Sequence, residues 1–309
     1  MNLMTVKKNK CSVLICLFLF FSLSAGILCA GETSTVLVIN SNAGVEKYRT
    51  VQEEFKKSLG MPVKEIDLGS QEVGEKQLRA AGASLVYCIG AKAYSLCSKY
   101  LEDTPTVFSS LINWQRLSLS QKAYGVSNEL NARMPIYMFR SVFPEVKKIG
   151  ILYSREYTLQ WFKDTAAQAS ELGIEIIGRA VSGQKDILPA VKELAKETKA
   201  LWLIADPMVM PEKQYLYDIL KTCQENRIPV FTYLGAFVEL GAVLSVAVDE
   251  PTIGRQAAGI AAELLAGKKP EDRVQFPAGS DITLDLKKAA EYGLEYNRDA
   301  LGLVNNIIR

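Results

Sequence analysis

The chain has 309 residues, of which 49% are hydrophobic and 23% are charged, and it contains no histidine. This composition is typical of a globular protein with a large core, and the length suits two domains. A formal net charge of +2 without a long basic stripe argues against a nucleic-acid partner. The lack of histidine excludes Ser–His and Cys–His nucleophile pairs and histidine metal sites. A hydrolase with two carboxylates in a cleft stays open, because any two acidic residues can meet in a fold. We nevertheless expect no enzyme, no metal and no cofactor.

The N-terminus has the three parts of a secretory signal peptide. A basic segment at residues 7–10 precedes an almost unbroken apolar stretch at 11–23, and small residues follow at 24–26. We predict a signal peptide over residues 1–30, with cleavage after Ala30. The protein is then periplasmic or otherwise extracytoplasmic.

Two alternatives remain for this segment. A membrane-anchoring helix over residues 11–30 has a marginal length, because a span needs about 20 apolar residues. Lipid modification of Cys29 is less favoured, because the residue before a lipidated cysteine is normally small and Leu28 is not.

The first half of the remaining chain predicts strands alternating with helices. Apolar and β-branched runs predict strands at residues 35–39, 63–68, 85–89, 106–109 and 124–126. The helical spacing of Tyr48, Val51, Phe55 and Leu59 predicts a helix that ends at Gly60. Such alternation indicates right-handed βαβ units and a parallel sheet.

The second half repeats this plan. Strands are predicted at residues 149–153, 175–181, 200–204 and 230–233, with helices marked by apolar positions between them. Each half ends its series with a proline before a short apolar strand, at Pro105 and at Pro229. Two similar α/β modules are the economical interpretation.

Further elements follow the second module. We predict a strand at 243–248, a helix at 253–264 after Pro251, and a late strand and helix at 282–292. A helix and a strand left over after two finished modules can return to each module in turn, which gives three crossings. We predict an N-terminal lobe of residues 31–140 plus 250–278 and a C-terminal lobe of residues 141–249 plus 279–309.

Seven segments along the chain form a recognisable series. They are Cys-Ile-Gly-Ala at 88–91, Phe-Pro-Glu-Val-Lys-Lys-Ile-Gly-Ile-Leu-Tyr at 143–153, Ala-Asp at 205–206, Pro-Val-Phe at 229–231, Gly-Arg-Gln-Ala-Ala at 254–258, Leu-Ala-Gly-Lys-Lys-Pro at 265–270 and Asp-Leu-Lys-Lys-Ala-Ala-Glu-Tyr-Gly-Leu at 285–294. In their order and spacing they resemble the ABC-transporter substrate-binding proteins of the tryptophan/tyrosine-receptor type. The chain departs from the family where it has Ser-Ser-Leu at 109–111 instead of an Asp-Pro pair. It departs again at residues 123–128, where it has Ala-Tyr-Gly-Val-Ser-Asn and the family often has a Gly-Asn-Ile-Thr-Gly loop.

The resemblance implies a fold and a function. The fold is two Rossmann-like lobes with parallel sheets joined by a three-crossing hinge, the type I periplasmic binding protein. The function is that of a monomeric receptor that closes on a small polar ligand, in this family an amino acid, and presents it to an ABC permease. The alternative is a sensing module that reports the same kind of ligand to a membrane kinase.

Candidate ligand-binding residues follow the strands, because ligands of open parallel sheets lie outside the carboxyl ends of the strands. Helix N-termini there suit a carboxylate. The candidates are Asn40, Ser41, Gly90, Ala91, Lys92, Ser109, Ser110, Ser127, Asn128, Tyr153, Asp206 and Tyr233.

Each candidate has a structural alternative. Asn40 and Ser41 either bind a carboxylate or cap the next helix, and Asp206 either neutralises a ligand ammonium or caps the turn at Pro207. Tyr153 and Tyr233 either form aromatic walls or pack in the core. We expect structural roles for Trp114, Trp161 and Trp202.

Overall fold

The computed structural model describes residues 34–309, so the predicted signal peptide and Cys29 lie outside the described residues. Strands of this part form two sheets, one of six strands and one of seven. We call each sheet with its covering helices a lobe, the first lobe holding β1 and the second β6. None of the helices in residues 34–309 is long and apolar enough to cross a membrane.

The first lobe contains the six-stranded sheet, in the order β11-β5-β4-β3-β1-β2, and all its neighbouring strands are parallel. Its elements are β1 (Val36–Asn40), α1 (Glu46–Leu59), β2 (Val63–Asp67), α2 (Glu75–Ala80), β3 (Leu85–Ile89), α3 (Ala91–Tyr100), β4 (Thr106–Ser109), η1 (Trp114–Arg116), β5 (Ala123–Val126), α9 (Glu250–Leu265) and β11 (Val274–Gln275).

The second lobe contains the seven-stranded sheet, in the order β13-β12-β10-β9-β8-β6-β7. Its elements are α4 (Arg133–Val142), β6 (Lys148–Ser154), α5 (Leu159–Glu171), β7 (Glu175–Val181), α6 (Gln184–Glu197), β8 (Ala200–Trp202), α7 (Lys213–Glu225), β9 (Val230–Thr232), α8 (Ala236–Glu239), β10 (Leu244–Val248), β12 (Ser280–Asp285), α10 (Leu286–Glu291), η2 (Arg298–Leu303) and β13 (Asn306–Ile308).

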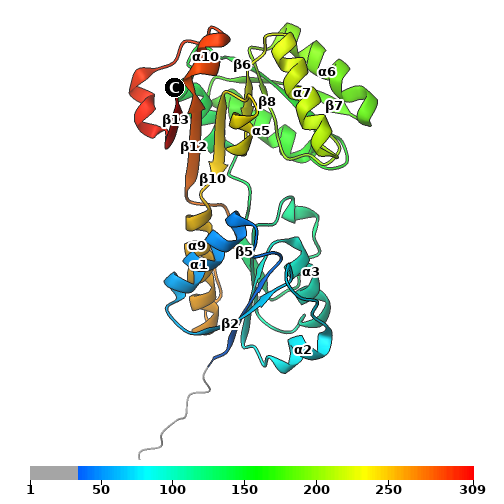
Figure 1. Cartoon of the computed structure of the whole chain (residues 1–309), viewed down its shortest axis with the longest axis vertical. Coiled ribbons are helices and arrows are strands. Elements are labelled where there is room, and N and C mark those ends of the chain that lie inside the picture. Colours follow the sequence, from blue (N-terminus) through cyan, green and yellow to red (C-terminus); the bar gives the residue numbers. More distant parts are fainter. Residues whose placement is uncertain (1–33) are drawn as a thin grey trace, which may run out of the picture. The chain divides into compact units, whose positions relative to one another are not determined.

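The chain passes between the two sheets three times, after β5, after β10 and after β11, as the predicted three-crossing fold requires (Figure 1). The pair β10–β12 is antiparallel, with Val248 opposite Ser280. The reason is the path of the chain: β10 runs out toward the first lobe, and β12 returns from it. The prediction of parallel sheets therefore holds except at this pair.

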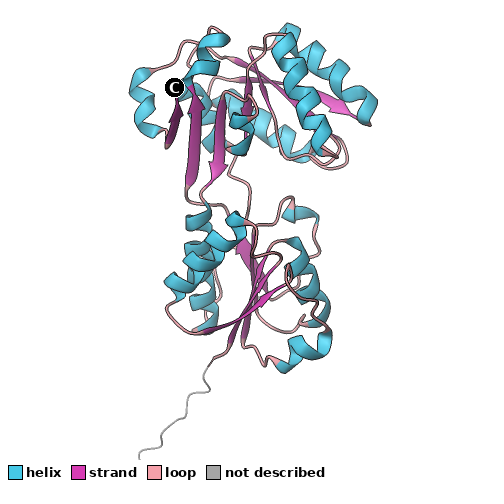
Figure 2. Cartoon of the chain, in the orientation of Figure 1, coloured by secondary structure: helices cyan, strands magenta, loops and turns pink. Residues whose placement is uncertain are grey.

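Helices cover both faces of each sheet, so both faces are buried, as parallel sheets require (Figure 2). In β1, Val36 and Val38 pack under α1 and α9, whereas Leu37 and Ile39 pack on the other face with α3. This alternation follows from the two-residue repeat of a strand. It explains why the predicted strands are continuous apolar runs.

Helix α4 was not among the predicted elements, and the predicted lobe boundary at residue 140 falls inside it. Its Ile136 and Phe139 are fully buried in the core of the second lobe, and the Phe139 ring packs 5.0 Å from Trp202. We therefore propose that the first lobe ends before α4.

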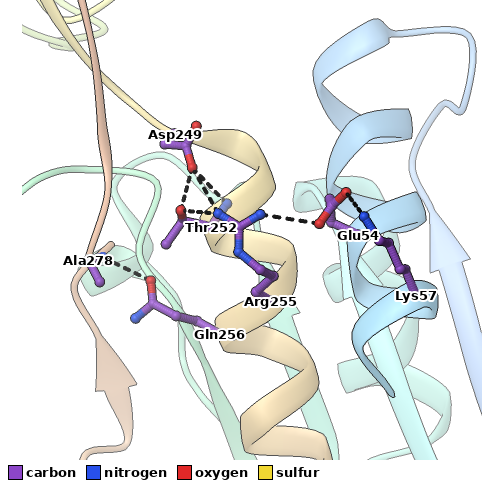
Figure 3. Close-up of polar contacts among 7 residues, drawn as sticks. All are labelled: Glu54, Lys57, Asp249, Thr252, Arg255, Gln256 and Ala278. Atoms are coloured by element: carbon purple, nitrogen blue, oxygen red, sulfur yellow. Dashed lines mark hydrogen bonds and ion pairs between the residues drawn. The ribbon is translucent and has the colours of Figure 1, made fainter. Parts of the chain in front are cut away.

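The first two turns of α9 hold the second and third crossings against the first lobe (Figure 3). Asp249 caps the helix by accepting a hydrogen bond from the Thr252 backbone N–H at 2.9 Å. Arg255 contacts Asp249 at 3.4 Å and Glu54 of α1 at 3.2 Å. The third crossing is held by Gln256, whose side-chain oxygen accepts from the Ala278 N–H at 2.9 Å. Both crossings are thus attached to the first lobe at the N-terminal end of α9.

Candidate functional site

A cavity of about 410 Å³ is lined by residues of both lobes. The first lobe supplies residues after β4, β5 and β11, and the second supplies α5 and residues after β6, β8 and β9. This volume suits a small molecule, and clefts between domains are a common place for ligands. Another cavity, of about 530 Å³, is lined by residues of the second lobe alone.

The second lobe gives this interlobe cavity an aromatic wall. Trp161 of α5 and Trp202 of β8 both line it, and their rings meet edge to face with centroids 5.3 Å apart. Tyr157 and Tyr233 also line it, and burial raises the pKa of the Tyr233 phenol to about 12. This tyrosine therefore stays protonated at neutral pH and keeps its hydrogen-bond donor.

Two exposed and opposite charges line the same cavity, Arg116 from the first lobe and Asp164 from the second, and Glu129 is a third, less exposed charged residue of the lining. The Arg116 guanidinium lies over the Tyr157 ring, 3.8 Å from its centroid. Asp164 accepts a hydrogen bond from the Gln160 side chain at 2.8 Å. Neither charge belongs to an ion pair in the described part of the chain. Both are therefore available to a zwitterion.

Glu129 holds the loop that carries Arg116 by hydrogen bonds to two residues of this loop. One Glu129 oxygen accepts from the Asn113 backbone N–H at 2.6 Å, and the other contacts the Gln115 side chain at 3.4 Å. Burial raises the pKa of the Glu129 carboxyl, although these hydrogen bonds act in the opposite direction. Ser110 and Asn113 have positive φ angles of 59° and 54°, a conformation uncommon outside glycine. Hydrogen bonds to Glu129 thus hold this loop in a defined conformation at the cavity wall.

The structure places most of the candidates in the first lobe within that lobe's own hydrogen bonds. The Asn40 side chain donates to Gln52 at 2.7 Å, and the Ser41 hydroxyl accepts from the Ala93 N–H at 3.0 Å at the start of α3. Lys92 donates to the Leu68 carbonyl at 2.7 Å, and Ser109 bonds with the Tyr87 hydroxyl at 2.7 Å. None of these residues lines the interlobe cavity.

Four more candidates of the first lobe lie at the same edge of its sheet but also outside the cavity lining. These are Gly90, Ala91, Ser110 and Ser127. Gly90 has a φ of 84°, and a Cβ there would lie 2.7 Å from the Ser41 hydroxyl, so glycine is required by both backbone and space. The Ser127 hydroxyl accepts from the Glu129 N–H at 3.0 Å. These contacts favour structural roles, and a part in ligand binding stays a prediction.

Asp206 is almost completely buried and accepts five hydrogen bonds from its own lobe. One oxygen accepts from the Met208 and Val209 N–H groups, and the other from Ser154 and Thr158. A carboxylate has about four lone-pair positions, so little capacity remains for a ligand ammonium. The contacts match the turn-capping alternative.

Two of the twelve candidates, Asn128 and Tyr233, line the cavity. Tyr153 instead stacks on Phe162, with centroids 4.2 Å apart, and does not line it. Trp161 and Trp202, for which structural roles were expected, form part of the wall.

The main contributor that the sequence analysis missed is one face of α5. Trp161, Asp164, Thr165 and Gln168 all line the cavity. Their spacing of three, four and seven residues places them on one side of the helix. An aromatic residue and polar residues at this spacing were a visible signal. The rule that ligands lie at strand ends directed attention to the loops instead.

Comparison with known proteins decides the family. Residues 36–306 match the model of the ABC transporter substrate binding protein family. The chain belongs to this family. Its members are substrate-binding receptors rather than enzymes.

Two curated relatives match parts of the chain. A tyrosine-binding protein of Clostridioides difficile is 20% identical over 197 residues, which are 61% of this chain and 56% of that protein. An uncharacterized protein of Rickettsia prowazekii is 26% identical over 213 residues, 67% of this chain and 66% of that protein. The matches thus span less than two thirds of either relative.

Solved structures of similar proteins share the fold. An ABC domain from Streptococcus pneumoniae in complex with L-Trp has a TM-score of 0.62 and 19% identity, and the match covers 89% of this chain and 99% of that one. A ligand-free, open substrate binding protein with adhesive properties from Clostridium difficile has a TM-score of 0.67 and 14% identity, over 89% and 98% of the two chains. The expected architecture of two α/β lobes is thus confirmed.

Proposed function

We propose that this protein is the extracytoplasmic receptor of an ABC importer and that it binds an aromatic amino acid in the interlobe cavity. The observation that carries the proposal is the lining of this cavity. It combines two tryptophans and two tyrosines with Arg116, Asp164 and Glu129, and none of these three charged residues forms an ion pair within residues 34–309. The L-Trp complex and the tyrosine-binding protein among the similar proteins point to the same ligand class.

The chemistry of a zwitterion explains the division of roles. Arg116 binds the α-carboxylate of the ligand, because a guanidinium matches a carboxylate in geometry and charge. Asp164 binds the α-ammonium. The side chain of the ligand packs against Trp161 and Trp202, where aromatic pairs gain free energy beyond their buried area. Because Arg116 and Asp164 come from different lobes, a ligand that binds both favours the closed arrangement of the receptor.

The biological setting follows from the family and the N-terminal pattern. We propose that the signal peptide over residues 1–30 exports the protein, which then acts as a monomer. An ABC permease in the membrane receives the ligand. A membrane kinase in place of the permease would make the protein a sensor, and the uptake of labelled ligand by membranes that contain the neighbouring permease tests this choice.

A thermal-shift screen of the purified protein tests the ligand class. The twenty amino acids are compared with sugars and nucleosides, and the protein is first unfolded and refolded to remove any carried ligand. A ligand at about a hundred times its Kd stabilises the fold by about 2.7 kcal/mol, so an aromatic amino acid gives a clear rise in Tm. A large rise with a sugar or nucleoside, and none with any amino acid, removes the proposed ligand class and leaves the fold unaffected.

A further inference from the structure

One buried polar atom in the wall of the interlobe cavity makes no hydrogen bond within the described residues. Among residues 34–309, five buried side-chain polar atoms make no hydrogen bond, and Gln168 Oε1 is one of them. Gln168 lines the interlobe cavity, whereas the residues that hold the other four atoms do not. A buried acceptor without a donor costs free energy, so this position needs an explanation that the packing of the lobe does not supply.

The place of Gln168 on α5 connects it with the aromatic wall. It follows Trp161, Asp164 and Thr165 on the same face of the helix, at the C-terminal end of that row. Asp164 is the proposed partner of the ligand ammonium, and Trp161 the partner of its side chain. The terminal torsion of glutamine is broad and roughly two-fold, so its carbonyl oxygen can turn into the cavity when a donor arrives.

We propose that Gln168 is a specificity-determining residue that accepts a hydrogen bond from the aromatic side chain of the ligand. This rests on the proposed function, and it narrows the ligand to an amino acid whose ring carries an N–H or O–H donor, an indole or a phenol. A phenyl ring fills the same space but leaves the acceptor unpaired. Sites built to bond a ligand N–H or O–H discriminate strongly against analogues that lack it.

Calorimetry with matched ligands tests the proposal. Tryptophan is compared with benzothienylalanine, in which sulfur replaces the indole N–H, and tyrosine is compared with phenylalanine. We expect the wild-type protein to bind the donor-bearing member of at least one pair about tenfold more tightly, which corresponds to about 1.4 kcal/mol. Gln168→Met keeps the size of the side chain and removes the acceptor. We expect Gln168→Met to lower the affinity for the ligand with the N–H or O–H donor and to leave the affinity for the ligand without the donor nearly unchanged.

Two controls separate specificity from general damage. Gln214→Leu changes an exposed glutamine of α7 outside the cavity lining and leaves all affinities as they are. Gln168→Glu keeps an acceptor, so the preference within the pair persists even if overall affinity falls. Equal binding of both members of each pair by the wild type, or an unchanged preference in Gln168→Met, overturns the role of Gln168 while the proposed function stands. No binding of any aromatic amino acid contradicts the proposed function itself.

Discussion

The Arg116 guanidinium lies 3.8 Å from the centre of the Tyr157 ring, and the two residues come from different lobes. Arginine over an aromatic face is a favourable cation–π contact. The contact holds the planar group in position without a carboxylate that would compete with a ligand. In the same way, the hydrogen bond from Gln160 holds Asp164 without neutralising it. Besides Glu129, the cavity thus presents two exposed charges, Arg116 and Asp164, that form no ion pair within residues 34–309.

Arg116→Gln should weaken the binding of an amino acid by at least tenfold, because charged hydrogen bonds contribute about 1.5–3 kcal/mol. The corresponding amine without a carboxylate, tryptamine for tryptophan, should bind wild type and variant alike. Calorimetry with both ligands measures the difference. An equal loss for amino acid and amine would show that Arg116 does not contact the carboxylate.

Asp164→Asn should give the reverse pattern. The affinity for the amino acid falls by a similar factor, whereas indole-3-propionate, which lacks the ammonium, binds as well as before or better because an uncompensated charge is gone. The same titrations measure it. An unchanged affinity for the amino acid would place its ammonium elsewhere in the cavity.

The sequence predicted the fold well where apolar runs were long. The strands expected at 85–89 and 175–181 are the observed β3 and β7. It failed at β11 and β13, which have two and three residues, because no periodicity is measurable over such a length. Helix α4 was missed although its apolar spacing was present. Pro135 lies in its first turn, where proline is tolerated, but a proline in a sequence usually argues against a helix.

The site was harder to predict than the fold. The strand-end rule led to Ser41 and Asp206, whose side chains stabilise loops inside one lobe. A ligand site between two lobes depends on which helix face and which loops meet across the gap. The spacing of Trp161 and the polar residues of α5 marks one face of a helix but does not show what that face meets. The position of Arg116 beside it depends on the tertiary structure, and no local pattern predicts it.

Asp206→Asn should lower the free energy of unfolding by about 1–3 kcal/mol. The amide group that replaces one carboxylate oxygen cannot accept from the Ser154 N–H, and a buried donor is left unpaired. Urea unfolding monitored by circular dichroism measures the loss, with Asp164→Asn as a control of the same chemistry at a less buried position. A wild-type midpoint for Asp206→Asn would contradict the loop-holding role.

Asp67 should contribute to acid sensitivity. Its carboxylate accepts from the Ala43 and Gly69 N–H groups, each at 2.9 Å, and these bonds lower its pKa. A lowered pKa in the folded state gives stability that is present above the unfolded value of about 3.9 and lost as the pH falls through the folded value. Asn keeps the acceptor but does not titrate, so Asp67→Asn should lose less Tm than wild type below about pH 4. Thermal unfolding at pH 3, 5 and 7 measures Tm for the wild type, for Asp67→Asn and for the exposed control Asp272→Asn. If the Tm of Asp67→Asn falls with pH as steeply as that of the wild type, Asp67 does not contribute to acid sensitivity.

Two glycines of α9 should respond in opposite directions to alanine. A Cβ at Gly254 would lie 2.5 Å from the Val51 carbonyl oxygen and 3.1 Å from the Phe55 nitrogen of α1, whereas a Cβ at Gly259 would meet nothing within 4 Å. Backbone cannot move aside as a side chain can, so Gly254→Ala should force α1 and α9 apart and cost about 1–3 kcal/mol.

Gly259→Ala should raise stability by about 0.5–1 kcal/mol, because glycine in a helix interior is unfavourable relative to alanine. Both changes add the same methyl group to the same helix, so the difference between their urea midpoints isolates the contact with α1. Equal midpoints would mean that the close approach of the two helices contributes nothing to stability. A fall for Gly254→Ala and a rise for Gly259→Ala would show that the first lobe requires glycine where α9 crosses α1.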